Sequence, residues 1–266
     1  MARWDWYQGT VHGVGVDEVA ASLVRCFDLS DLCPSRPRNG YHQGAEVRRG
    51  SNVLAKIWWG GNPGVHVIGT GEDSPAVAGV LHGLEHRVTR ADACEDWVEA
   101  GLFDRLWSGL SAYAKAAGIT INQQGDWVSN KGRTGYLGAR TSSCQLVLYE
   151  KGAQMGVDSP WVRLEVRVYP KGPAGYRVAS WAPGEAFGAA AWLVEALKCI
   201  GWNHLTAQGV GTVWRPSDAD KAKRHLVKQY KATISAWRDE CGGSWESFGQ
   251  AFEALAKELS DGVLLH

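Results

Sequence analysis

The sequence contains no Cys-x-x-Cys pair, no long hydrophobic run and no nucleotide-binding P-loop. Its six cysteines are scattered, which is typical of reduced thiols, so we expect a cytoplasmic protein. No apolar run approaches the ~18 residues that a membrane span needs, and the N-terminal residues do not resemble a secretory signal. Because GxxxxGK[ST] is missing, the sequence does not predict an NTP-driven motor.

The chain also lacks net charge, with 28 Lys and Arg against 28 Asp and Glu among 266 residues. A basic footprint over the whole protein is therefore excluded, and any nucleic-acid surface must come from local clustering. An apolar content of 45% is enough for a hydrophobic core.

The hydrophobic pattern alternates between period 2 and period 3.6 along the first 200 residues. Strands are predicted at 3–12, 41–49, 52–59, 64–70, 86–97, 119–122, 134–139, 144–150 and 161–169. Helices are predicted at 16–27, 75–84, 102–117, 185–200, 217–238 and 245–260. This order predicts an α+β fold with a mainly antiparallel central sheet, flanking helices and a helical C-terminal appendage. We place a catalytic domain at 1–202 and the helical region at 203–266.

The segment RVTRADACED, residues 87–96, reads as a strand with several polar residues on one face. Alternation places Arg90, Asp92, Cys94 and Asp96 together. A buried unpaired carboxylate is costly, and a hard divalent cation would satisfy both aspartates. Pairing of Asp92 with an arginine is an equally good explanation.

In WVRLEVRVYP, residues 161–170, the even-numbered Val and Leu form a packed face. Arg163, Glu165, Arg167 and Tyr169 line the other face. By itself this row indicates arginine and glutamate side chains that form ion pairs with one another along the strand. Beside the first strand, Glu165 supplies a third carboxylate and the arginines supply phosphate-binding groups.

The segment SCQLVLYEKG, residues 143–152, places Tyr149 and Lys151 on the same strand face. A phenol has an ordinary pKa near 10, and a nearby ammonium lowers it and so favours the nucleophilic phenolate. We expect Lys151 to have this effect on Tyr149. An ordinary strand tyrosine with a solvated lysine is the simpler explanation of this segment alone.

Taken together, the three segments provide carboxylates, guanidinium groups and a phenol on one sheet. This set suits phosphodiester transesterification assisted by Mg²⁺ or Mn²⁺. A competing motif is His82-Gly-Leu-Glu85-His86, which matches the H-x-x-E-H pattern of zinc peptidases. Gly83 weakens that helix, so a zinc hydrolase is the less favoured alternative.

The segment 218–238 is locally basic and includes Lys221, Lys223, Arg224 and Lys228. Such a face is commonly only solvated. Alternatively, it contacts the phosphates of duplex DNA.

The blocks RVTRADACED, GYLGARTSSCQLVLYEKG and WVRLEVRV resemble, in order and spacing, the signature blocks of a replication-initiator family. This is the Rep_trans or replication initiation factor family of rolling-circle initiators, which occurs in plasmids and filamentous phages. The opening WDWYQGTV is similar to the start of phage members. The resemblance covers roughly residues 3–200.

The resemblance implies a metal-dependent enzyme of a bacterial host that cuts one strand of origin DNA, duplex or single-stranded, through a tyrosine. It matches Tyr149 to the nucleophile, with Tyr136 as the rival, and Asp92, Glu165 and less certainly Asp96 to the ligands of Mg²⁺ or Mn²⁺. Candidate DNA contacts are Arg90, Arg140, Lys151, Arg163, Arg167, Lys221, Lys223, Arg224 and Lys228. A helicase and a second copy of the chain are possible partners. A non-catalytic DNA-binding regulator on the same fold is the alternative.

Overall fold

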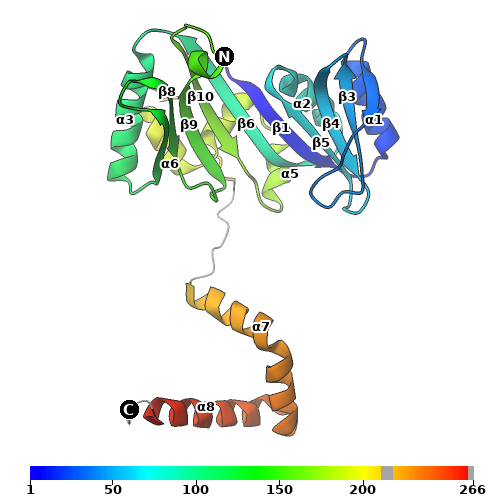
Figure 1. Ribbon diagram of the computed structural model, residues 1–266, viewed down its shortest axis with the longest axis vertical. Coiled ribbons are helices and arrows are strands. Elements are labelled where there is room, and N and C mark those ends of the chain that lie inside the picture. Colours follow the sequence, from blue (N-terminus) through cyan, green and yellow to red (C-terminus); the bar gives the residue numbers. More distant parts are fainter. Residues whose placement is uncertain (211–217, 263–266) are drawn as a thin grey trace. The chain divides into compact units, whose positions relative to one another are not determined.

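The computed structural model describes residues 1–210 and 218–262 of the chain, which divides into two units, Met1–Val213 and Trp214–His266. The described part of the first unit is built on a ten-stranded antiparallel sheet with the order β2-β3-β4-β5-β1-β6-β10-β9-β8-β7 (Figure 1). The strands are β1 (Arg3–Val11), β2 (Asp31–Pro34), β3 (Gln43–Arg49), β4 (Asn52–Trp59), β5 (Val65–Thr70), β6 (His86–Val98), β7 (Ile121–Asp126), β8 (Lys131–Leu137), β9 (Cys144–Glu150) and β10 (Trp161–Val168).

Helices α1, α2, α3, α5 and α6 of the first unit contribute residues to the hydrophobic core, whereas the short α4 lines a pocket with residues of the opposite face. α1 contacts β2, β3 and β4, and α2 contacts β1 and β5. α3 contacts β7, β8 and β9, and α5 contacts β6. Their bounds are α1 (Val16–Cys26), α2 (Ser74–His82), α3 (Leu102–Ala116), α4 (Lys151–Gln154), α5 (Ala174–Val178) and α6 (Ala191–Lys198), with 3₁₀ turns η1 (Gly71–Asp73) and η2 (Pro183–Gly188). Strand alternation explains the arrangement, because the even-numbered residues of β10 enter the core while Arg163, Glu165 and Arg167 lie on the other face. We call that other face the open face.

Two irregularities in the pairing of β1 with β6 alter which residues reach the open face. Gln8 pairs with Arg90 and Gly9 with Val88, so Thr89 is an additional residue on β6. Trp4 pairs with Ala93 and Trp6 with Asp92, so Asp5 is an additional residue on β1. A β-bulge brings two consecutive residues to the same side. Thr89 with Arg90, and Asp5 with Trp6, therefore all contribute to the open face.

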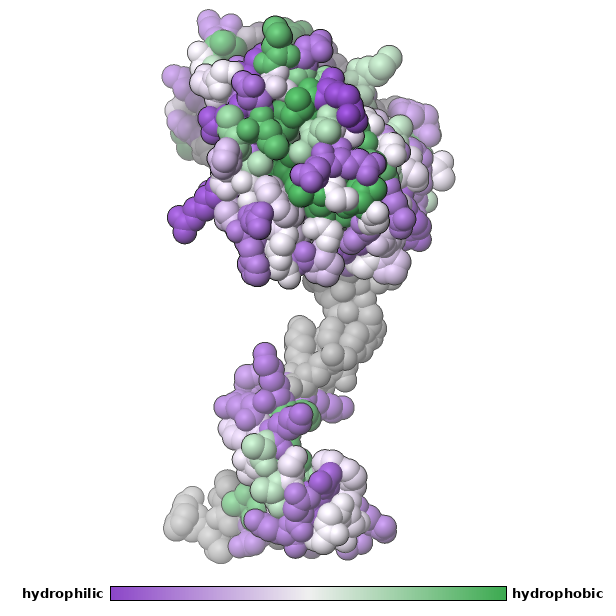
Figure 2. Space-filling model, turned by 90° about the vertical axis from the view of Figure 1, so that its right-hand side faces the viewer, coloured by the Kyte–Doolittle hydropathy of each residue, from purple (hydrophilic) through white to green (hydrophobic). Residues whose placement is uncertain are grey.

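The sheet ends at β2, a short edge strand that contains Pro34. Short edges with proline discourage pairing with another chain. Figure 2 views the sheet unit from the side where β3, β4 and α1 lie in Figure 1, and hydrophobic side chains are visible there among hydrophilic ones. Leu29 and Leu32, at the start of this edge, are 93% and 48% exposed.

The second unit contains α7 (Asp218–Glu240) and α8 (Trp245–Gly262). α7 has a kink at Tyr230, whose backbone is not helical. Trp237 of α7 contacts Phe248 of α8, with ring centroids 5.1 Å apart. Along the described ranges of both units, no helix is long and apolar enough to cross a membrane.

The predicted α+β class, antiparallel sheet and C-terminal helices are confirmed. The expected helix at 185–200 is instead η2 followed by α6, because Ala190 between them has an extended backbone. Strand β2 was not predicted. Residues following 202 continue to pack on the sheet unit, since Val210 is 4% exposed and its amide bonds to the carbonyl of Ala189 at 3.0 Å.

Candidate functional site

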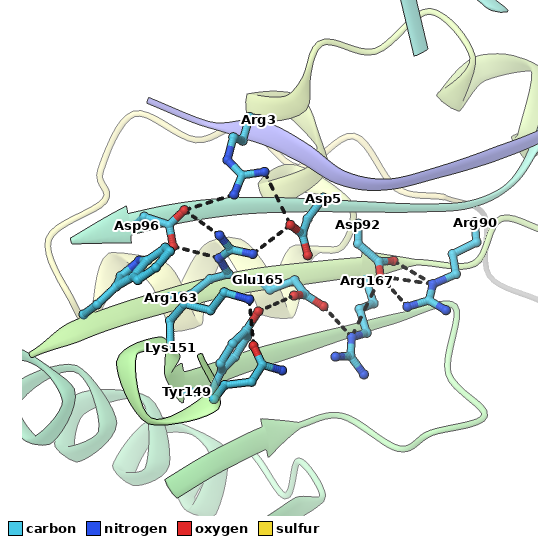
Figure 3. A network of polar contacts seen from close by, with 12 residues as sticks. Arg3, Asp5, Arg90, Asp92, Asp96, Tyr149, Lys151, Arg163, Glu165 and Arg167 are labelled. Atoms are coloured by element: carbon cyan, nitrogen blue, oxygen red, sulfur yellow. Dashed lines mark hydrogen bonds and ion pairs between the residues drawn. The ribbon is translucent and has the colours of Figure 1, made fainter. Parts of the chain in front are cut away.

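The polar residues of β6, β9 and β10 lie side by side on the open face (Figure 3). Three cross-strand rows join them: Asp92–Arg167–Gln145, Cys94–Glu165–Val147 and Asp96–Arg163–Tyr149. Residues directly opposite one another on antiparallel strands share a face and are close enough to interact. The structure therefore brings together the three segments that the sequence singled out.

Asp92 is almost completely buried, with 2% of its surface exposed. Arg90 donates to both carboxylate oxygens, its Nε lying 3.0 Å from each. Burial and the neighbouring charge of Glu165 raise the pKa of Asp92 to about 7, although Arg90 and Arg167 oppose the shift. Asp92 is thus a carboxylate whose charge has a high energetic cost near neutral pH.

Glu165 is 3% exposed and accepts two hydrogen bonds. Arg167 Nε donates to Oε1 at 2.6 Å, and the Tyr149 hydroxyl donates to Oε2 at 3.1 Å. Arg167 Nε also lies 4.0 Å from Asp92 Oδ2. One guanidinium therefore holds both carboxylates.

Tyr149 has a different environment from the one that the sequence suggested. It is 6% exposed, and burial together with the charge of Glu165 raises its pKa, whereas the sequence predicted a lowered one. Lys151 is the first residue of α4, and its Nζ bonds to Gln154 Oε1 at 2.7 Å, 5.8 Å from the centroid of the Tyr149 ring. The expectation that Lys151 activates Tyr149 is wrong, because the strand ends before Lys151 and the ammonium is directed to another acceptor.

Tyr136 is half-buried on β8, opposite Val147 of β9. Its hydroxyl donates to Gln124 Oε1 at 3.0 Å, and the Arg167 guanidinium lies 5.8 Å from its ring centroid. Tyr136 is therefore the more accessible of the two candidate phenols.

Both tyrosines line a pocket of about 480 Å³ together with Asp92, Glu165 and Arg167. We call it the tyrosine pocket. Pockets of this size hold small ligands or single groups of larger ones. Its lining carries two phenols together with four carboxylates, two guanidinium groups and one ammonium, which belong to Asp5, Asp92, Glu150, Glu165, Arg90, Arg167 and Lys151.

Asp96 belongs to a second network rather than to this pocket. It accepts from Arg163 Nε at 2.7 Å, from Arg163 Nη2 at 2.9 Å and from Trp161 Nε1 at 2.8 Å. Burial alone would raise the pKa of Asp96, but the hydrogen bonds of Arg163 and Trp161 outweigh it, so the pKa is lowered. Arg163 is itself 2% exposed and also bonds to Asp5 at 2.7 Å. Arg163 and Asp96 thus hold strands together.

Of the carboxylates that the sequence predicted as ligands of a divalent cation, Asp92 and Glu165 line the tyrosine pocket. Within residues 1–210 and 218–262 no three His, Cys, Asp or Glu side chains gather closely enough to hold a metal. Mg²⁺ is often bound through only one or two carboxylates, with water and phosphate oxygens completing its shell. Asp92 and Glu165 provide oxygen donors of that kind, and a cation would compete for them with Arg90, Arg167 and Tyr149. Asp96 is bonded to Arg163 and Trp161 and does not line the pocket.

The remaining predicted DNA contacts are dispersed. Arg140 is exposed and lines a neighbouring pocket of about 470 Å³ with Arg90, Tyr136 and Arg167. Lys223 and Lys228 are exposed on α7, in the second unit. The backbones of Lys221 and Arg224 are in α7, but their side chains lie outside the described part of the structure.

The His82-x-x-Glu85-His86 motif does not form a zinc site. α2 ends at His82, and His86 begins β6, so the two histidines are not on one helix. His86 Nε2 is 2.9 Å from the Tyr7 hydroxyl, and Nδ1 is 2.9 Å from the Leu84 carbonyl oxygen. Both ring nitrogens of His86 already have protein partners, so the zinc alternative is discarded.

Two residues of the site were missed by the sequence reasoning. Asp5 bonds to Arg163, and Trp6 stacks on the Arg90 guanidinium at 4.2 Å. The alternation in RWDWYQ places Asp5 and Trp6 on opposite faces, and only the β-bulge brings both to the open face.

A solved structure with a similar fold is the rolling-circle replication initiator protein from Geobacillus stearothermophilus. The two chains are 21% identical with a TM-score of 0.53, and the match covers 70% of this chain and 82% of that one. No protein-family model matches the sequence, and no curated protein matches it significantly. The comparison therefore shows a shared fold.

Proposed function

We propose that this protein initiates rolling-circle replication by nicking and rejoining one strand of origin DNA through a covalent phosphotyrosine. The observation that carries the proposal is the tyrosine pocket, where two phenols lie beside Asp92, Glu165 and Arg167. The fold shared with a rolling-circle initiator supports the same function. Such a function would place the protein in a bacterial cytoplasm, with a helicase and a second copy of the chain as further partners.

In the proposed reaction a tyrosine oxygen bonds to phosphorus and the bond from phosphorus to the 3′ oxygen breaks. The phenol loses one proton and the 3′ oxygen gains one, which leaves a free 3′-OH and a 5′-phosphotyrosyl link. Arg167 and Arg90 would stabilise the charge on the phosphoryl group. Asp92 and Glu165 would hold Mg²⁺ or Mn²⁺, which when bound polarises the phosphate.

We assign the attacking phenol to Tyr136. A nucleophile must be reached by the phosphate, and Tyr136 is half-buried whereas Tyr149 is 6% exposed. Burial and Glu165 also raise the pKa of Tyr149, which makes it a poorer source of phenolate. The hydrogen bond from Tyr149 to Glu165 instead positions this carboxylate beside Arg167.

The test uses a pool of random-sequence single-stranded oligonucleotides labelled at the 3′ end, with Mg²⁺ or Mn²⁺. Tyrosine attack leaves the 3′ part of the strand on the protein, so the label should migrate with the protein through SDS. Tyr136→Phe should abolish the adduct, whereas Tyr149→Phe should reduce its rate and leave the site of attachment unchanged.

Tyr113→Phe, on α3, serves as a matched control and should behave as the parent. An adduct that survives in Tyr136→Phe and disappears in Tyr149→Phe would reverse the assignment. DNA binding without any adduct, under either metal, would favour a non-catalytic regulator on the same fold.

A further inference from the structure

A second pocket, of about 500 Å³, opens on the same sheet next to the tyrosine pocket. It is lined by Gln8 of β1, His66 of β5, and Arg87 and Thr89 of β6. Tyr41, in the loop before β3, and Asn62, in the loop after β4, also line it. We call it the Arg87 pocket. The reaction proposed above makes no use of it.

The charge of the Arg87 pocket differs from that of the tyrosine pocket. Asp5, Asp92, Glu150 and Glu165 line the tyrosine pocket, whereas the residues lining the Arg87 pocket include no carboxylate. Arg87 is half-buried, and among the described residues no acidic group forms an ion pair with it. An unpaired, partly desolvated guanidinium in a pocket without acids suits a phosphate group.

One wall of the pocket is aromatic. Tyr41 stacks on His66 with ring centroids 5.6 Å apart, and His66 stacks on Trp58 with centroids 5.8 Å apart. His66 is fixed by a 3.0 Å hydrogen bond between Nδ1 and Thr10 Oγ1. A rigid stack of this kind provides a flat surface on which a nucleobase can lie.

The rest of the lining is polar and uncharged. Gln8 Nε2 donates to Thr89 Oγ1 at 2.9 Å, and Asn62 Nδ2 donates to the Asn39 carbonyl at 2.9 Å. Side-chain amides such as these are groups that hydrogen-bond the edges of bases.

The two pockets are adjacent along the strands. On β1, Trp6 lines the tyrosine pocket and Gln8 lines the Arg87 pocket. On β6, the bulge places Thr89 in one pocket and Arg90 in the other. Two residues of a strand span roughly 7 Å, and the Trp6 indole donates to Gln8 Oε1 at 2.9 Å. A DNA strand that leaves the tyrosine pocket over Trp6 would thus reach the Arg87 pocket directly.

The structure assigns the Arg87 pocket, on this basis, to one unpaired nucleotide of the substrate strand, with its phosphate on Arg87 and its base against Tyr41. This assignment rests on the proposed nicking function and adds single-stranded DNA next to the scissile phosphate as the form that is recognised. A base stacked within a duplex cannot enter a pocket of this size without first leaving the helix.

The test measures binding apart from chemistry. In a Tyr136→Phe background without divalent ions, fluorescence anisotropy follows a fluorescein-labelled mixed-sequence 20-mer, as a single strand and as a duplex. Arg87→Gln and Tyr41→Leu should each weaken single-strand binding about tenfold. Arg25→Gln on α1 and Tyr113→Leu on α3 remove the same groups from the helix-covered side and should change it less than twofold.

A second measurement needs no destabilising substitution. With 5-iododeoxyuridine in the single strand, ultraviolet cross-linking of the otherwise unmodified chain should attach DNA to the peptide containing Tyr41. Cross-links confined to other peptides, or equal binding by Arg87→Gln and Arg25→Gln, would overturn the assignment. Neither result bears on the phosphotyrosine adduct, whose absence from the parent protein would instead refute the proposed function.

Discussion

Replacing Arg163 by glutamine should destabilise the sheet unit strongly, because this side chain is 2% exposed and joins three strands. The change removes two contacts with Asp96, at 2.7 and 2.9 Å, and one with Asp5, at 2.7 Å. Removing one member of a buried ion pair costs about 3–5 kcal/mol. The two aspartates are 22% and 26% exposed, so water replaces part of what is lost. We therefore expect a loss of about 3 kcal/mol, at the low end of that range.

Thermal unfolding followed by circular dichroism measures the effect. A loss of this size lowers the Tm of a domain of about 200 residues by roughly 6–12 °C. Arg105→Gln is the matched control, because Arg105 and Glu99 pair at 2.6 Å but are 60% and 53% exposed. That change should cost at most about 0.5 kcal/mol. Equal melting of the two variants would refute the view that Arg163 holds the strands together.

The pH dependence provides a further check on the same prediction. The pKa of Asp96 is lowered in the folded state, so its stabilising contribution is present above its ordinary pKa of about 3.8 and is lost as the pH falls below it. The difference between the parent and Arg163→Gln should therefore shrink in acid. A difference that stays constant from pH 7 to pH 3 would contradict the role assigned to the Asp96 carboxylate.

Three other changes have defined outcomes. Burial, with a smaller effect of Arg87, lowers the pKa of His66 to about 4. The free energy of unfolding should therefore fall by up to about 3 kcal/mol as the pH falls from 6.5 to 4, because the unfolded chain binds the proton more tightly. Urea unfolding of His66→Gln should lack this loss. Gly135→Ala should cost about 1–3 kcal/mol, because the new Cβ would collide with the Trp107 ring. Gly79→Ala on α2 meets no atom within 4 Å and should stabilise. Chelation by EDTA should abolish the phosphotyrosine adduct and added Mn²⁺ should restore it, while Arg87-dependent binding should persist throughout.

The faces of the central strands were predictable from the sequence. Period-two alternation places Asp92 on one side of β6 and Glu165 on one side of β10, and the structure has both on the open face. Their proximity was only a hypothesis, since the alternation within a strand does not say which strands are neighbours. That depends on the pairing of β6 with β10, whose residues are about 70 positions apart in the sequence.

The errors arose where strand geometry was extended too far. Tyr149 and Lys151 share a face only if the strand continues, but α4 begins at Lys151 and redirects its ammonium to Gln154. Asp5 was missed for the converse reason, because a bulge cannot be read from the alternation that it interrupts. The local pattern was informative within each strand and failed at its ends and irregularities.

The arginines of the open face have a consequence for how salt affects the protein. Arg90 is held by Asp92, Arg167 by Glu165 and Arg163 by Asp96 and Asp5. A free cation on a protein surface gains affinity for DNA when the phosphate it neutralises releases its condensed counterions. Here an arriving phosphate must displace a carboxylate of the protein from the arginine. The displaced carboxylate then attracts a cation from solution, which offsets the counterion that the DNA releases. The logarithm of the affinity should therefore fall with the logarithm of the salt concentration less steeply than the number of arginines suggests, and unpaired Arg87 should contribute more to that slope than any of the three.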